Sequence, residues 1–501
     1  MLLGVVALAP GAAFAVVALR RIGYPYELSY FEGSTVEVTA RVVHGLPLYG
    51  PPTTDFTPWP YPPMYFWLTG ALAQVAGVSI TSLRLVSFVA SLIVLVLIAL
   101  VVRRAGGSLL AGVVAAGLYA TSYRVSGAWA DTARVDSLLL AFLLGAILLG
   151  LRARTWRGGM AVGGLLFLAF LTKQNALLVA APMLLWLLVG RRPVGLSAAG
   201  TLVCSVTVST VVGDLITGGW YSPYVISQLL GQPLAARWLL EFWFVDLLAP
   251  FAIAIGLGVW LVHRFGPDAP AGPGRPRQAR WRQARWRIGE DASYLAVCVL
   301  GLLLAALAGR LHDGGYANVA MPAHVGAAIG FGLVVAMVLR HSACGRRTVV
   351  VLAGALAVQF IVMTFWRLDV IPTDADRAAG DAFIASVRNL PGEVLIPTHP
   401  YYLRLAGLPT HASAIAIGDV LHSRGGRGRD AMAAALPWDL AGVSAIVLDN
   451  EGDTALFGDT LARDFTMVST SFVAAGVFVP VTDAPTRPAL LYVRTSLLAA
   501  P

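Results

Sequence analysis

Acidic side chains in the first polar segment of the chain are the first candidates for chemistry. Residues 26–37 read Tyr-Glu-Leu-Ser-Tyr-Phe-Glu-Gly-Ser-Thr-Val-Glu and follow an apolar run. Ser34 and Glu37 have the spacing of a capping box, which predicts a helix from Thr35 to His44. Glu32 would then lie just before the helix N-terminus, where N–H groups keep a carboxylate ionised. We therefore expect Glu32 to act as a general base or to orient an acceptor hydroxyl.

The same segment allows other assignments. Glu37 and Arg41 have the i,i+4 spacing of an ion pair, and Gly45 is placed to end the helix. Glu27 follows Tyr-Pro-Tyr and is a second candidate for the site. The alternatives are that Glu32 only complements the helix dipole in a solvated loop, and that Glu27 is solvated at a membrane interface.

A second group of ionisable residues opens a later apolar run. Arg124, Asp131, Arg134 and Asp136 lie in or beside this short polar segment. Charged groups at such a position usually line an internal cavity, because exposing them to lipid is costly. We expect Asp136 to be catalytic and the other three to bind substrate.

Two further polar interruptions contribute candidates. Lys173 begins a Lys-Gln-Asn sequence between two apolar runs, and its alternative role is that of a snorkelling lysine in a hairpin turn. Residues 310–318 are rich in glycine and in hydrogen-bonding groups, and their alternative role is that of a plain polar loop. The expected substrate-binding residues of this second segment are Arg310, His312, Tyr316 and Asn318.

The strongest candidates are expected at one depth on one side of a membrane. They are Glu32, Asp131, Asp136, Lys173, Arg310 and His312. A single site explains this shared position better than six coincidences. Such a site offers carboxylates for acid–base chemistry and cations for a phosphate leaving group.

The composition is that of an integral membrane protein. Of 501 residues, 57% are hydrophobic and 13% are charged, and the mean hydropathy is +0.73. A soluble domain with a wet surface does not have this balance. The net charge of +9 comes almost wholly from arginine, because Lys173 is the single lysine. Arginines clustered between apolar runs are typical of cytoplasmic loops, so we expect no nucleic-acid partner.

Apolar runs of bilayer length predict about eleven helical spans. They lie near residues 2–19, 84–102, 108–123, 136–151, 159–172, 175–190, 194–215, 244–263, 292–309, 319–339 and 348–366. A run of small residues near the N-terminus resembles a signal-peptide cleavage site. No basic segment precedes it, so we interpret residues 2–19 as a span or signal anchor.

Arginine positions predict the orientation. With the N-terminus inside, five basic segments lie in the cytoplasm, as the positive-inside rule requires. They are 103–104, 152–157, 191–192, 264–287 and 340–347. Arg20 and Arg21 are an exception, since this topology places them outside. The stretch from Gly266 to Arg287 is rich in Pro, Gly and Arg and is expected to be a flexible basic linker.

The chain is therefore expected to have two parts. Residues 1–366 form a helical membrane module, with an outer loop over 21–83 that includes an interfacial helix from Met64 to Gly77. Residues 367–501 differ in composition and predict a small extracytoplasmic α/β domain. Its expected elements are a helix over 374–390 and strands over 393–397, 444–448, 472–479 and 489–493.

Several of these segments resemble motifs of the GT-C superfamily of glycosyltransferases. Phe31-Glu32-Gly33, followed by a helix ending in Gly45-Leu-Pro-Leu-Tyr49, resembles the first-loop signature of protein O-mannosyltransferase-like and aminoarabinose-transferase-like enzymes. Phe31 stands where the family has a leading carboxylate, which leaves Glu32 or Glu27 as the base. Residues 62–67 resemble the family's interfacial helix, residues 134–136 its second-loop Arg-x-Asp, and residues 171–175 its Lys-Gln turn. In the order of its apolar runs, the likeness covers residues 1–366.

The resemblance implies an enzyme that takes a sugar from a polyprenyl phosphate. The acceptor would be a hydroxyl of an extracytoplasmic glycan, lipid or protein, and transfer would be a direct displacement with inversion. The protein would lie in the plasma membrane and would serve the assembly of cell-envelope glycans or glycoconjugates. The sequence agrees in lacking a Gly-x-Gly-x-x-Gly or Walker loop that would hold a nucleotide sugar. Some relatives use a divalent cation and others do not, so a metal is left open.

Two other functions fit the same features. A transporter or flippase for a lipid-linked glycan would bind at the charged mouth without reacting, although no inverted repeat is visible in the sequence. A membrane protein with a non-catalytic glycan-binding tail is the third. An enzyme is favoured by the long acidic first loop together with the outer domain.

Overall fold

The computed structural model describes residues 2–266, 289–312, 314–341, 344–365, 370–436 and 438–498. The basic linker, from residue 267 on, and the expected boundary between residues 366 and 367 lie outside the described residues.

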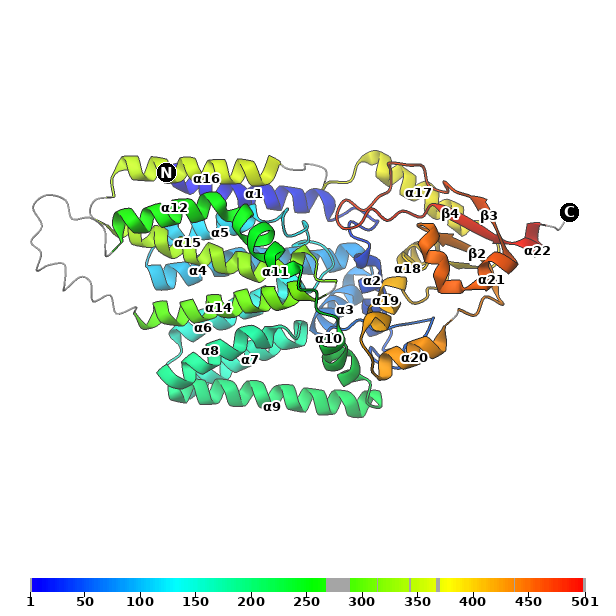
Figure 1. Cartoon of the computed structure of the whole chain (residues 1–501), viewed down its shortest axis with the longest axis horizontal. Coiled ribbons are helices and arrows are strands. Elements are labelled where there is room, and N and C mark those ends of the chain that lie inside the picture. Colours follow the sequence, from blue (N-terminus) through cyan, green and yellow to red (C-terminus); the bar gives the residue numbers. More distant parts are fainter. Residues whose placement is uncertain are drawn as a thin grey trace, which may run out of the picture.

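Apolar helices, side by side, form the larger part of the molecule (Figure 1). In the described ranges, a helix covers each of the eleven predicted spans: α1 (Leu2–Arg21), α4 (Ile80–Gly106), α5 (Leu109–Thr121), α6 (Asp136–Arg152), α7 (Trp156–Thr172), α8 (Ala176–Gly190), α9 (Arg192–Thr217), α12 (Ala249–Phe265), α14 (Glu290–Leu311), α15 (Met321–Arg340) and α16 (Arg346–Phe365). Among the described residues, seven helical stretches are long and apolar enough to cross a membrane. The chain is a multi-pass membrane protein.

Small residues let some of these helices approach closely. In α7, a Cβ added to Gly159 would lie 2.4 Å from the Val194 carbonyl oxygen, and one added to Gly163 would lie 2.4 Å from that of Ala198. Both contacts are with α9. Lipid tails are as apolar as the side chains, so close van der Waals packing of this kind holds membrane helices together.

The described residues of the predicted basic segments lie at the end of the helices remote from the C-terminus (Figure 1). There, Asp291 pairs with Arg104 at 3.2 Å and with Arg191 at 3.4 Å, and Arg191 also contacts Glu290. The predicted grouping of these loops at one end is therefore confirmed.

Short helices lie at the opposite end, between the long helices and the C-terminal part. They are α2 (Phe31–Val43), α3 (Met64–Ala76), η1 (Pro223–Ser227), α10 (Gln228–Gly231), α11 (Trp238–Glu241), η2 (Phe242–Leu248) and η3 (Ala317–Ala320). The interfacial helix was predicted to end at Gly77, and α3 ends one residue earlier.

The predicted start of the first-loop helix was wrong. The helix α2 begins at Phe31, four residues before Thr35, and Ser34 donates a hydrogen bond to the Phe31 carbonyl instead of capping. Glu37 does not pair with Arg41. Its oxygens accept hydrogen bonds at 2.8 and 2.6 Å from Arg404, which is far away in sequence.

The C-terminal part, residues 370–498, is an α/β unit with a four-stranded sheet of order β1-β2-β4-β3. β1 and β2 are parallel, and β4 is antiparallel to β2 and β3. The strands are β1 (Glu393–Leu395), β2 (Val443–Leu448), β3 (Phe465–Ser469) and β4 (Leu490–Arg494). The helices are α17 (Asp374–Arg388), α18 (Pro400–Ala406), α19 (Ala414–His422), α20 (Arg427–Ala435), η4 (Glu451–Phe457), α21 (Asp459–Asp464) and α22 (Thr495–Leu498).

Three of the four expected strands are present, and the strand predicted over 472–479 is not. That segment is a loop in which Phe478 has a φ of 57°. Its alternating apolar pattern serves packing instead, because Phe478 lies 5.0 Å from the ring of Tyr26 and Phe472 lies 5.5 Å from that of Phe383. β3 was missed because it is an edge strand with three exposed residues in a row.

The C-terminal part packs on the first loop and on α2 and α3 through a shared hydrophobic cluster. Val36, Tyr65, Tyr402 and Ala445 are buried members of that cluster. The loop that carries the predicted acidic residues is therefore enclosed between the helices and the C-terminal part.

Candidate active site

Four polar residues lie close together at the start of α6, the end of α7 and in η3, on the side of the helices that faces the C-terminal part. Asp136, the first residue of α6, accepts a 2.8 Å hydrogen bond from Lys173 Nζ and a 2.9 Å bond from Asn318 Nδ2. Arg134 lies two residues earlier. We call Arg134, Asp136, Lys173 and Asn318 the mouth cluster, and all four were candidates from the sequence.

Arg134 is buried but incompletely hydrogen-bonded. Its guanidinium carbon lies 3.9 Å from the centre of the Trp129 ring system and 4.4 Å from that of Phe31. Its Nη2 makes two long contacts, 3.3 Å to Asp483 and 3.4 Å to Ser29. The buried Nε has no partner. The aromatic rings hold the cation, and they leave N–H donors available for an anion.

Aromatic side chains line the surroundings of the mouth cluster. Lys173 Nζ lies 5.7 Å from the centre of the Tyr61 ring. Tyr316 packs edge-on against Trp129 at 6.2 Å, and its hydroxyl lies 3.4 Å from that of Tyr30. Burial raises the pKa of the Tyr61 phenol above its ordinary value of 10, so Tyr61 is neutral at physiological pH. Tyr316, also a candidate from the sequence, thus belongs to these surroundings.

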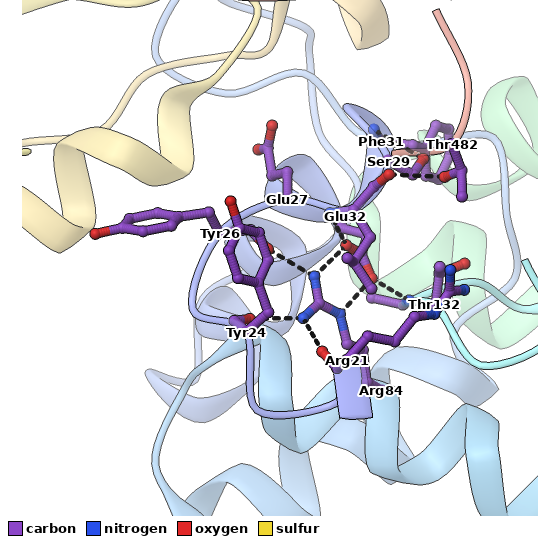
Figure 2. Close-up of polar contacts among 12 residues, drawn as sticks. Arg21, Tyr24, Tyr26, Glu27, Ser29, Phe31, Glu32, Arg84, Thr132 and Thr482 are labelled. Carbon is purple, nitrogen blue, oxygen red and sulfur yellow. Dashed lines mark hydrogen bonds and ion pairs between the residues drawn. The ribbon is translucent and has the colours of Figure 1, made fainter. Parts of the chain in front are cut away.

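Glu32 is fully buried and fully hydrogen-bonded (Figure 2). Its Oε2 accepts bonds from Arg84 Nη2 at 2.6 Å and from the Leu28 N–H at 2.8 Å. Its Oε1 accepts bonds from Arg84 Nε at 2.9 Å and from the Ala133 N–H at 2.8 Å. Burial tends to raise the pKa of Glu32, but Arg84 and these N–H groups outweigh it, so the net pKa is lowered. Such a carboxylate is a poor proton acceptor, and the geometry favours a structural role over a base.

Arg84, near the start of α4, was not among the candidates. Its Nη groups also donate to three carbonyl oxygens of the first loop: Arg21 at 3.2 Å, Tyr24 at 2.6 Å and Tyr26 at 2.7 Å. All five of its N–H donors are used. An arginine at the border of an apolar run needs such partners. Its position at that border is the sequence feature from which Arg84 could have been predicted as a buried polar residue.

Glu27 is buried. The alternative that it is solvated at a membrane interface is therefore wrong. It contacts His399 Nδ1, and His399 Nε2 lies 3.1 Å from Asp449. Burial raises the pKa of Glu27 to about 7, although His399 acts in the opposite direction. Burial would lower the pKa of His399, but the carboxylates of Asp449 and Glu27 outweigh it and raise this pKa to about 10. This Glu27–His399–Asp449 link ties the first loop to the C-terminal part.

Asp131 does not join the mouth cluster. Both of its oxygens bond to Arg21, at 2.6 and 2.7 Å, and one also accepts from the Tyr123 hydroxyl at 2.8 Å. The pair is buried, which explains why Arg21 departs from the positive-inside rule: its charge is neutralised inside the protein.

The remaining candidates lie elsewhere. Arg310 pairs with Asp246 at 2.7 Å and stacks 4.2 Å from the Trp238 ring system. His312 forms an isolated bridge with Leu234. Arg124 is half-buried beside Tyr123. Of the six residues expected at one site, the contacts therefore join only Asp136 and Lys173 directly.

No group of three or more His, Cys, Asp or Glu among the described residues is placed to hold a metal ion. The Glu27–His399–Asp449 link is not a metal site either. Its two carboxylates bind opposite nitrogens of one imidazole ring, so the three side chains do not converge on one point.

Asp483 is the main site residue that sequence reasoning missed. It comes from the loop before β4 and reaches Arg134 across 349 positions of the chain. Nothing in the local sequence marks it, since Thr-Asp-Ala-Pro has the composition of an ordinary turn.

Comparisons with known proteins agree with this architecture. Residues 60–213 match the family model described as dolichyl-phosphate-mannose-protein mannosyltransferase. That stretch contains α3 to α8 and most of α9, with Arg134, Asp136 and Lys173. The comparison with curated proteins gave no match.

Solved structures match over the whole chain. ArnT from Cupriavidus metallidurans bound to undecaprenyl phosphate is similar with a TM-score of 0.59 and 15% identity, covering 99% of each chain. The same protein in the apo state has a TM-score of 0.60, also at 15% identity, covering 99% of this chain and 98% of that one. An Archaeoglobus fulgidus oligosaccharyltransferase tethered with an acceptor peptide has a TM-score of 0.50 and 12% identity over 88% of this chain and 69% of that one. The chain thus has the fold of GT-C membrane glycosyltransferases.

Proposed function

We propose that this protein is a glycosyltransferase that moves a sugar from a polyprenyl phosphate to a hydroxyl of an extracytoplasmic glycan, lipid or protein, with inversion. The proposal places it in the plasma membrane, with the mouth cluster and the C-terminal part outside the cytoplasm, in cell-envelope glycan or glycoconjugate assembly.

The observation that carries the proposal is the unfilled hydrogen-bonding capacity of two cations, the buried Arg134 and the partly buried Lys173. Arg134 has an unpartnered Nε, and Lys173 gives one of its three N–H donors to Asp136. Burying a cation with spare donors is costly unless a ligand completes the site. A phosphate, with several anionic oxygens, has the charge and the acceptors that both residues lack.

A lipid tail also has a place beside these cations. An apolar groove of about 580 Å³ runs between α3, α4 and α6 and is lined in part by Leu68, Val89, Leu138 and Phe142. Leu138 is two residues from Asp136, so the groove begins near the mouth cluster. A prenyl chain in this groove would bring its phosphate toward Arg134 and Lys173. That ArnT was crystallised with undecaprenyl phosphate supports a donor of this class.

In the proposed reaction, the acceptor oxygen attacks C1 of the sugar while the bond from C1 to the phosphate oxygen breaks. Lys173 and Arg134 neutralise the charge that develops on the departing phosphate. Asp136 holds Lys173 and Asn318 in position. Arg310, His312, Arg124 and Asp131 are assigned no contact with substrate, and Glu32 and Glu27 shape the first loop.

The test is transfer of radiolabelled sugar from polyprenyl-phosphate donors by the purified protein in liposomes. We expect Lys173→Gln to lower the transfer rate by about 100-fold or more, because one charge-stabilising donor is lost. Arg104→Gln is the matched control, since Arg104 pairs with Asp291 at the other end of the helices. It should retain wild-type activity.

Other outcomes would replace the proposal. Movement of an intact lipid-linked sugar across the bilayer without its release would identify a flippase. Binding of glycans with no release of sugar from any lipid donor would identify a binding protein. Accessibility of a cysteine introduced at the exposed residue Arg463 to an impermeant thiol reagent in whole cells tests the orientation.

A further inference from the structure

A carboxylate from the C-terminal part lies against the mouth cluster. The Asp483 side chain is 1% exposed, and its Oδ2 lies 3.3 Å from Arg134 Nη2 and also contacts the Ser29 hydroxyl. The other oxygen, Oδ1, is buried and has no hydrogen-bond partner. Almost all buried polar atoms in proteins are paired, so an orphaned carboxylate oxygen indicates a missing donor.

The backbone holds Asp483 in an unusual conformation. Its φ is 71°, in the left-handed region that side chains other than glycine, asparagine and aspartate rarely adopt. The preceding residue fixes it there. The Thr482 N–H and hydroxyl both donate to the Leu28 carbonyl, at 2.9 and 2.7 Å, and Figure 2 shows Thr482 beside Ser29. These two bonds fix the backbone beside Asp483 against the first loop.

A purely structural ion pair does not account for this geometry. The contact with Arg134 is long and involves one oxygen, whereas the pair of Arg84 and Glu32 is bidentate at 2.6 and 2.9 Å. The first loop is also tied to the C-terminal part by other bonds, such as that of Tyr26 with Asp381 at 2.5 Å. Glu27 Oε1 and Asp449 Oδ1 are also buried without a partner, but neither carboxylate contacts Arg134. Asp483 therefore keeps one oxygen available next to the cation proposed for the phosphate.

We propose that Asp483 binds the acceptor hydroxyl through Oδ1 and accepts its proton during transfer. This inference rests on the proposed function. The acceptor O–H proton moves to Asp483, the acceptor oxygen bonds to C1 of the sugar, and the electron pair of the broken C1–O bond leaves with the polyprenyl phosphate. The C-terminal part thereby completes the active site.

The charges around Asp483 suit a proton acceptor. Burial raises its pKa, opposed by Arg134 and Ser29, while the charge of Glu32 adds to the rise. Tyr30 also faces it. A pKa above that of a free carboxyl makes the ionised group a stronger base than a solvated aspartate.

The experiment compares Asp483→Asn with Asp381→Asn in the full-length reconstituted protein. Asp381 is a matched control, because it also joins the first loop to the C-terminal part but lies away from Arg134. We expect Asp483→Asn to lower kcat by about 100-fold or more, as loss of a general base does, with the KM for the lipid donor within about threefold of wild type. Asp381→Asn should keep nearly full activity.

The pH dependence separates chemistry from structure. The wild-type rate should fall on the acid side as Asp483 becomes protonated, and the residual rate of Asp483→Asn should lack this limb. Ser29→Ala removes a hydrogen bond that lowers the pKa of Asp483, so its acid limb should move to higher pH. This second variant keeps the test valid if Asp483→Asn does not fold.

Each remaining outcome has one meaning. If wild type transfers sugar and Asp483→Asn is as active as Asp381→Asn, or if the acid limb is unchanged in Ser29→Ala, the inference is overturned and the proposed function stands. If wild type transfers no sugar from any lipid donor, the proposed function fails and this inference falls with it.

Discussion

Buried arginines in this protein differ in how completely they are hydrogen-bonded. Arg84 uses all five donors, and Arg21 donates to Asp131 and to the carbonyls of Ala128 and Val370. Arg84 has no donor left for another anion, and Arg21 has four of its five donors in use, so these two cations hold the polar loops together. Arg134 keeps an unpartnered Nε and is the buried arginine that we expect to bind substrate.

Replacing Glu32 by glutamine should affect folding before it affects chemistry. The substitution leaves the buried Arg84 without its counter-charge, and breaking a buried pair costs about 3–5 kcal/mol. We expect a markedly lower thermal midpoint in detergent and a lower yield in membranes. Asp464→Asn, which removes an exposed partner of Arg463, should change neither. A Glu32→Gln protein with the wild-type midpoint but no transfer would return Glu32 to the role of base.

Helix packing positions the cations of the mouth cluster. Lys173 follows the last residue of α7, and α7 is fixed against α9 by the close approach at Gly159 and Gly163. The position of the Lys173 side chain therefore depends on the fit between α7 and α9.

Two neighbouring glycines of α7 offer a matched test of this dependence. A Cβ at Gly163 would meet the backbone of Ala198, whereas one at Gly164 would meet nothing within 4 Å. Gly163→Leu should push α7 from α9, lower stability by about 1–3 kcal/mol through overpacking, and reduce transfer. Gly164→Leu should preserve both, as measured by thermal midpoint and transfer rate. Equal behaviour of the two variants would show that this contact does not position Lys173.

At the scale of the whole molecule, the C-terminal part is bonded to the first loop at several points. Besides the contacts of Thr482, these include the pair of Arg404 with Glu37 at 2.6 Å and the Glu27–His399–Asp449 link. The active site that we propose is enclosed only when the two parts are joined. We therefore expect the proposed activity to require their association.

The buried His399 makes that association dependent on pH. The pKa of His399 is raised from 6.5 to about 10 in the folded protein. A raised pKa means that the folded state binds the proton more tightly, so the stabilisation is complete below about pH 6.5 and is lost as the pH rises through about 10. We expect His399→Gln to lower the thermal midpoint strongly at pH 6 and less at pH 10. A difference between wild type and variant that stays constant over this range would contradict the assignment of a protonated His399.

The sequence by itself determined the helices and their grouping. Lipid requires apolar helices and arginines require water. Hydropathy therefore located a helix in each of the eleven predicted apolar runs, and charge identified the basic segments whose described residues lie at one end of these helices. The same reasoning marked Arg134, Asp136, Lys173 and Asn318, because charged or polar residues at the ends of apolar runs are costly unless they are used.

Only the tertiary structure decided which polar residues share a site. Glu32 looked reactive from its neighbours in sequence, but Arg84, 52 positions away, occupies its oxygens. The sequence around Asp483 is that of an ordinary turn, but the fold places Asp483 beside Arg134, which is 349 positions away in the chain. Hydrogen-bond saturation depends on partners that the chain supplies from distant segments, and no local pattern of residues records it.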